Sequence, residues 1–176
     1  MTSKNKTPPQ QLHKPVLLEA TLKALAPKQG ETYLDLTAGY GGHAREFIGN
    51  IGVATNATLV DRDDFAVEHL QDLAHDGARI IKSDFASAAR ILAERGEQFD
   101  LILIDLGVSS PQLDNQDRGF SIIHPGPLDM RMDRSQQETA ADLIDNASEA
   151  KLVSIIREYG EEPKARAIAR EIMQAR

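Results

Sequence analysis

From residue 12 to residue 106 the chain alternates short apolar runs with segments of helical periodicity. The apolar runs lie at 32–37, 58–61, 79–82 and 101–105, and helical patterns follow the first three at 44–48, 64–74 and 87–95. Regular strand–helix alternation of this kind indicates parallel strands joined by right-handed crossovers. The run at 101–105 is apolar on both faces, which is typical of a strand that helices cover on both sides. The chain is therefore predicted to be an α/β protein built on a parallel sheet.

The alternation ends near residue 106, and the composition then changes. Residues 107–134 are rich in Gly, Pro, Ser and Asp and have no clear periodicity, and loops of such length are usually functional or disordered. Residues 135–176 contain short helical stretches, and Ser148 is suited to cap one of them. The polar first residues, 1–11, are expected to form a disordered arm. Four parts are thus predicted, at 1–11, 12–106, 107–134 and 135–176.

Composition excludes several classes of protein. The chain has no cysteine, which excludes disulfides, thiolate metal sites and a cysteine nucleophile. Its five histidines are scattered, so no metal site is expected. The net charge of −7 argues against a general nucleic-acid binder but leaves room for a local basic patch. With no apolar run long enough for a membrane span and no signal peptide, a soluble cytoplasmic protein is expected.

A glycine-rich turn follows the first predicted strand. Gly39, Gly41 and Gly42 lie just before His43, where the strand gives way to a helix. Glycines let a backbone pass close to a ligand, and a helix N-terminus offers free N–H groups. An ordinary tight turn would have the same composition, so this motif alone leaves both interpretations open.

Acidic residues end the other predicted strands. Asp61 comes about 20 residues after the glycines, where a Rossmann-type site binds ribose hydroxyls. Asp84 and Phe85 follow the third strand, where they can meet an adenine amine and ring, and Asp105 ends the fourth. The alternatives are a solvated turn for Asp61, plain core for Phe85 and a turn cap for Asp105. A nucleotide-like ligand at this edge fits either a dehydrogenase or a methyltransferase, since Ala44 in the third glycine position is a permitted exchange.

Longer motifs give a specific resemblance. They lie at 13–18 (HKPVLL), 39–43 (GYGGH), 61–63 (DRD), 105–114 (DLGVSSPQLD), 118–121 (RGFS), 126–133 (GPLDMRMD) and 159–162 (YGEE). In order and spacing the chain resembles the bacterial 16S ribosomal-RNA cytosine-N4 methyltransferase family, the MraW type, from about residue 12 to its end. The resemblance implies a Rossmann-like class I methyltransferase core that uses S-adenosyl-L-methionine, followed by the start of an inserted helical domain.

The resemblance also implies roles for individual residues. The cofactor is expected over Gly39 and 41–43, with Asp61 on its ribose, Asp84 and Phe85 near its adenine, and Asp105 and Gln112 near its amino-acid end. The implied reaction methylates N4 of a cytidine in the decoding region of 16S rRNA. Its catalytic residues are placed at Asp105, as acceptor for the amine, and Ser109. The missing cysteine independently disfavours methylation at C5 of a pyrimidine.

The implied partner is 16S rRNA in the small ribosomal subunit. Arg118, Arg131 and Arg134 lie in or beside the long loop and are candidates for phosphate contacts. The alternative is that they pair with nearby carboxylates, at Asp117, Asp129 and Asp133.

The resemblance covers only the first half of the family's length. Family members continue with further strands of the sheet, so this chain is expected to end inside the inserted helical domain. The alternative function is therefore a truncated, catalytically weak cofactor-binding module. A sheet edge left bare with apolar faces invites association, so a homo-oligomer is also expected.

Overall fold

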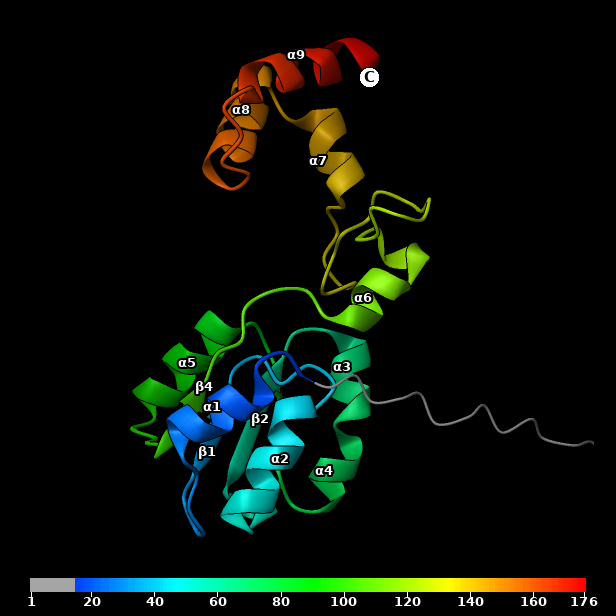
Figure 1. Ribbon diagram of the computed structural model, residues 1–176. Helices are drawn as coiled ribbons and strands as arrows, with labels where there is room; N and C mark the ends of the chain where they lie inside the picture. Colours follow the sequence, from blue (N-terminus) through cyan, green and yellow to red (C-terminus); the bar gives the residue numbers. More distant parts are fainter. Residues whose placement is uncertain (1–14) are drawn as a thin grey trace, which may run out of the picture. The chain divides into compact units, whose positions relative to one another are not determined.

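The computed structural model describes residues 15–176, so the arm predicted at 1–11 lies outside the described residues. The chain folds into two compact units, one that ends at Ser110 and one that comprises Pro111–Arg176 (Figure 1). The boundary between the two units falls inside the segment predicted as a long loop, 107–134.

The first unit is built on a four-stranded parallel sheet. Its strands are β1 (Tyr33–Asp35), β2 (Ala57–Asp61), β3 (Arg79–Lys82) and β4 (Leu101–Leu103), in the order β3-β2-β1-β4. The predicted Rossmann-like parallel sheet is confirmed. Parallel strands end at the same edge of the sheet, so the segments that follow β1, β2 and β4 lie at one edge. The strand order reverses between β1 and β4, and open α/β sheets bind ligands at such a point.

Helices of the first unit pack on the two faces of this sheet. They are α1 (Leu18–Leu25), α2 (Gly42–Ile51), the 3₁₀ turn η1 (Ala54–Asn56), α3 (Asp64–His69), α4 (Gln71–His75) and α5 (Phe85–Glu94). The helix predicted at 64–74 is divided at Leu70, whose fully buried side chain packs into the core between α3 and α4.

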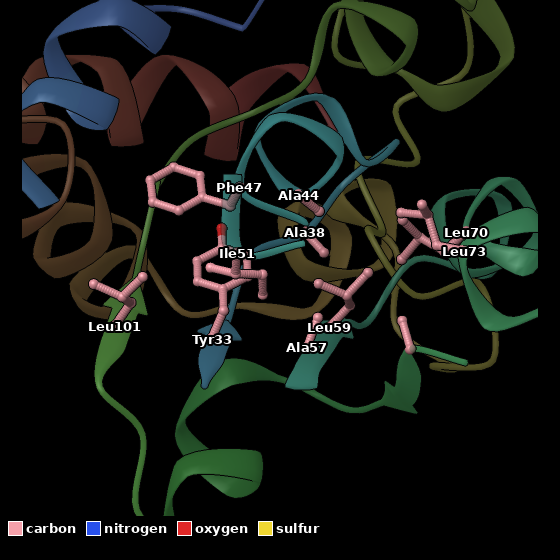
Figure 2. Packing of buried hydrophobic residues seen from close by; sticks show 11 residues of the cluster. Tyr33, Ala38, Ala44, Phe47, Ile51, Ala57, Leu59, Leu70, Leu73 and Leu101 are labelled. Atoms are coloured by element: carbon pink, nitrogen blue, oxygen red, sulfur yellow. The ribbon is translucent and has the colours of Figure 1, made fainter. Parts of the chain in front are cut away.

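The larger core cluster lies between the sheet and α2. Tyr33, Phe47, Ile51 and Leu59 are fully buried there (Figure 2). The rings of Tyr33 and Phe47 stack with centroids 4.7 Å apart. On the opposite face Leu34, Leu36 and Val60 pack against Ala88 and Leu92 of α5. These two layers fix the strand ends from which the site is built.

The strand β4 is less covered than its composition predicts. Ile102 is 51% exposed and Ile104 is 48% exposed. Ile102 pairs with Leu34, so it lies on the face that α5 covers over β1 and β2. The prediction that helices cover this run on both sides is wrong for the described residues, because β4 is the last strand in the order and α5 packs further along the sheet.

The second unit contains short helices and an irregular segment. Its elements are α6 (Ser110–Asp114), η2 (Gln116–Arg118), α7 (Ala140–Asn146), α8 (Glu149–Glu158) and α9 (Ala165–Ala175), of which α6 begins at the boundary residue. Ser148 accepts a hydrogen bond from the Lys151 amide, which confirms the predicted cap. Within residues 15–176, no helix is long and apolar enough to cross a membrane.

Candidate functional site

The turn after β1 is bonded to both neighbouring strands. The Leu36 amide donates to the Leu103 carbonyl at 3.0 Å, and the Ala38 amide donates to the Val60 carbonyl at 2.9 Å. A side chain of the turn adds a third hydrogen bond: Thr37 Oγ1 accepts the Asp105 amide at 2.7 Å. The turn is thereby held between β2 and the segment that follows β4.

Glycines let this turn reach the start of α2. Gly39 and Gly41 have φ of +53° and +82°, a backbone region that favours glycine. A Cβ on Gly41 would lie 3.0 Å from Leu70 Cδ2, and a Cβ on Gly42 would collide with the ring of Pro15. Gly41 is also the N-cap of α2, and because it has no side chain it leaves the first amides of the helix without a side-chain cap. The helix therefore starts with backbone N–H groups directed toward the turn.

His43 is buried in the first turn of α2. Its Nδ1 lies 3.8 Å from Oδ2 of Asp105. Its Nε2 is buried and has no hydrogen-bond partner among residues 15–176. A buried polar atom of this kind is costly unless something pairs with it, so His43 is suited to meet a polar group of a ligand.

Asp35 lies beneath the turn, and its role in the site was not predicted from the sequence. Only 1% of its surface is exposed. Tyr33 Oη donates to its Oδ2 at 2.9 Å, and the Thr37 amide donates to its Oδ1 at 3.0 Å. Burial raises the pKa of Asp35 from 3.8 to about 6; the two hydrogen bonds oppose this rise, and the charges of Asp61 and Asp105 add to it.

Asp61 ends β2 and belongs to the same acidic edge. Its Oδ2 accepts the Gly39 amide at 2.8 Å, and its Oδ1 accepts the Asp63 amide at 2.9 Å. Burial raises the pKa of Asp61 despite these bonds. A carboxylate has about four lone-pair positions, so both oxygens retain room for a ligand hydroxyl. No group of three or more His or acidic residues in the described part of the chain is arranged to hold a metal ion.

Asp84 and Phe85 follow β3. Asp84 is the N-cap of α5, where its Oδ1 accepts the Ser87 amide at 2.9 Å, and this bond lowers its pKa. Phe85 is 40% exposed, so the alternative that it is plain core is wrong. An aromatic ring accessible at the carboxyl end of β3 is compatible with the predicted adenine contact.

The remaining predicted site residues behave differently from one another. Ser109 is half-buried at the end of the first unit, and the Asp105 carboxylate is exposed. Gln112 is buried in α6 and belongs to the second unit, as do the three arginines proposed for RNA. The structure thus brings together the glycine turn, His43, Asp61 and Asp105 within one unit.

Two of the three arginines hold the loop together. Arg118 is 2% exposed, and its Nη2 donates to the carbonyls of Arg131 and Met132 at 3.1 and 3.0 Å. Arg131 pairs with Asp129 through Nε at 2.7 Å and Nη2 at 2.9 Å, as the alternative interpretation expected. This pair lowers the pKa of Asp129 to about 2. Arg134 is exposed, and its Nη2 donates to the Asp117 carbonyl at 2.9 Å.

The raised pKa of Asp35 predicts how its replacement changes stability. Ionisation of the buried carboxyl disfavours the folded state, so its favourable contribution is complete below pH 3.8 and is lost as pH rises through about 6. Asp35→Asn should therefore gain about 1.4 kcal/mol of stability relative to the parent between pH 5 and pH 8, since the other half of the total effect of about 3 kcal/mol is already lost below pH 5. Urea unfolding at both pH values measures this difference. Asp100→Asn, an exposed change at the other edge of the sheet, is the control, and a pH-independent effect of Asp35→Asn would contradict the prediction.

Comparison with known proteins gives the same family that the motifs suggest. The profile of the MraW methylase family matches residues 10–176. The ribosomal RNA small subunit methyltransferase H of Methylobacillus flagellatus is 44% identical over 93% of this chain and 51% of its own length. The protein of the same name from Synechocystis is 46% identical over 93% of this chain and 55% of its own length. A third, from Acidithiobacillus ferrooxidans, is 41% identical over 96% of this chain and 54% of its own length.

The family profile spans the turn, the acidic strand ends and the helical unit. The chain spans about half the length of the curated relatives it matches. With a family profile that covers nearly all of it and the expected parallel sheet, the chain belongs to the MraW methylase family.

Proposed function

We propose that this chain carries the cofactor site of a methyltransferase that modifies N4 of a cytidine in the decoding region of 16S rRNA. The observation that carries the proposal is the glycine turn, bonded between β2 and the end of β4 above an acidic strand edge. The family uses S-adenosyl-L-methionine, and the relatives' names specify ribosomal RNA of the small subunit.

The residues at this edge fit that cofactor. A cationic ligand suits an edge where Asp35, Asp61 and Asp105 lie close enough for their charges to interact. The unpaired Nε2 of His43 and the start of α2 suit polar groups of the ligand. Asp61 is proposed to bind the ribose, Asp84 and Phe85 the adenine, and Asp105 the amino-acid end; the cofactor contact predicted for Gln112 stays a prediction, because this residue belongs to the second unit.

The exposed carboxylate of Asp105 suits the acceptor side of the reaction. S-adenosyl-L-methionine supplies a methyl group on a sulfonium sulfur; the new N4–carbon bond replaces the sulfur–carbon bond, and one N–H proton must leave. Asp105 is proposed to accept a hydrogen bond from the N4 amine and to take that proton. Ser109, four residues further along, is the second catalytic candidate. Neither group acts as a nucleophile toward the ring.

The RNA partner requires cations that are not fully engaged within the protein. Arg134 is the strongest phosphate candidate of the three, because its guanidinium is exposed and bonded to a carbonyl. Arg118 and Arg131 are proposed to act on RNA mainly by fixing the loop. A ribosomal substrate would place the protein in the bacterial cytoplasm.

A second candidate function is that of a cofactor-binding module with little catalysis of its own. It is favoured by the half-exposed side chain of Ile102 in β4. Both candidates place the same ligand at the same edge, so they differ in turnover rather than in cofactor binding.

Replacing Asp61 should weaken cofactor binding. Asp61→Ala loses a charged hydrogen-bond acceptor, which is worth roughly 1.5–3 kcal/mol, or about 10- to 100-fold in Kd. Isothermal titration calorimetry with S-adenosyl-L-methionine measures the change. Asp61→Asn keeps an acceptor for the Gly39 amide and should lose less. Asp64→Asn, an exposed carboxylate three residues further along at the start of α3, is the matched control; unchanged affinity in Asp61→Ala would remove Asp61 from the site.

A methyl-transfer assay tests the reaction and separates the two candidates. Radiolabelled cofactor and under-methylated small subunits are incubated with this chain and with any longer product of its reading frame. N4-methylcytidine should be the labelled nucleoside, and the amount of label that this chain alone transfers decides between the two candidates. Label in a different nucleoside would overturn the substrate proposal. Full turnover by a monomer of this chain would overturn the module.

The exposed face of β4 should make this chain self-associate. Ile102 lies in the last strand of the described sheet and Ile104 just follows it, where an apolar face and free edge favour contact with a second copy. Ile102→Glu should shift sedimentation toward the monomer without loss of folded signal. Ile122→Glu, at a fully exposed loop residue, is the control. A parent chain that sediments as a monomer at high micromolar concentration would contradict the expectation.

A further inference from the structure

Burying the ionised carboxyl of Asp35 lowers the stability of the fold, and the hydrogen bonds that it makes do not need a charged group. A neutral side chain such as Asn can also accept the Thr37 amide and share a hydrogen bond with Tyr33. Asp35 is almost fully buried, so it is placed to act on a ligand through its charge rather than by direct contact. Buried groups that lower stability are most often retained where function uses them.

Several ionisable groups face this carboxyl from the elements around it. Tyr33 lies on the same strand, and its hydroxyl donates a hydrogen bond to Asp35. Asp61 at the end of β2 and Asp105 after β4 are close enough to raise its pKa. His43 on α2 directs Nδ1 toward Asp105. The edge therefore carries up to three negative charges, and the state of Asp35 decides whether the third is present.

We propose that Asp35 is a positioning residue that makes the site prefer a sulfonium ligand over the thioether product, and that this preference depends on its ionisation. The inference rests on the proposed use of S-adenosyl-L-methionine. The cofactor and S-adenosyl-L-homocysteine differ by one methyl group and one positive charge at sulfur. A fixed negative charge beneath the turn favours the charged ligand, and a neutral Asp35 does not.

The direction with pH follows from the pKa of Asp35, which burial raises to about 6. Near pH 5 the carboxyl is mostly protonated, and near pH 7 it is mostly ionised. At an effective dielectric constant of about 20, one unit charge about 10 Å away changes the affinity for a cation by more than about tenfold, and one about 25 Å away changes it by about threefold. Taking the ratio of the two dissociation constants cancels the effect of protein groups whose titration changes the binding of both ligands equally.

The test is calorimetry of both ligands on the 176-residue chain at pH 5, 6 and 7. The ratio of the Kd for S-adenosyl-L-homocysteine to that for S-adenosyl-L-methionine should rise at least about threefold from pH 5 to pH 7. In Asp35→Asn the ratio should stay flat. Asp100→Asn, which removes a carboxylate from the opposite edge of the same sheet, should match the parent.

A second variant keeps the test decisive if Asp35→Asn folds poorly. Tyr33→Phe keeps the ring that stacks on Phe47 and removes the hydroxyl that donates to Asp35. The pKa of Asp35 then rises further, because this hydrogen bond favours the ionised form. The increase in the ratio should therefore move to higher pH.

The outcomes separate this inference from the function on which it rests. If neither ligand binds at any pH, the proposed function fails and the inference fails with it. If both bind and the parent ratio is flat, the inference alone is overturned. A rise that persists in Asp35→Asn also overturns it, since the titrating group is then another one.

Discussion

The hydrogen bonds that Asp35 accepts hold the turn on which the site depends. A turn that leaves a strand and enters a helix has backbone groups without regular partners. Here Asp35 accepts the Thr37 amide from below, Thr37 then accepts the Asp105 amide, and Asp61 accepts the Gly39 amide. Three strand ends are tied to one loop in this way, so the relative positions of the candidate ligand contacts are set before any ligand arrives.

The acidic edge of the sheet lowers the stability of the fold, and burial of apolar side chains in the core offsets this loss. Asp35 and Asp61 are carboxyls whose pKa values burial raises, and Asp105 adds negative charge beside them. The stacked Tyr33 and Phe47 rings and the apolar layers on both faces of the sheet supply the compensating burial. A cationic ligand would relieve part of the repulsion, which links the electrostatics of the edge to the proposed cofactor.

The sequence was a good guide where local pattern determines structure. The bounds predicted for β3 are those observed, and the acidic residues after the strands lie at one edge because parallel strands end together. Asp35 was missed because its role depends on three neighbours that meet only in the folded sheet. The exposure of Ile102 was missed because apolar composition cannot tell an edge strand from a central one. Leu70 divides a predicted helix because its tertiary packing outweighs the helical pattern.

The arginines show why charge pattern alone is a weak guide to RNA contacts. Arg118 and Arg131 come from motifs that suggested phosphate binding, yet their guanidinium groups satisfy carbonyls and a carboxylate within the loop. In a chain of net charge −7, a guanidinium that is paired internally adds little attraction for a phosphate. In the proposed function, these residues would contribute to RNA recognition through the shape of the loop and through exposed cations such as Arg134. A loop built around a buried arginine holds such a shape without the RNA, because its contacts are already made.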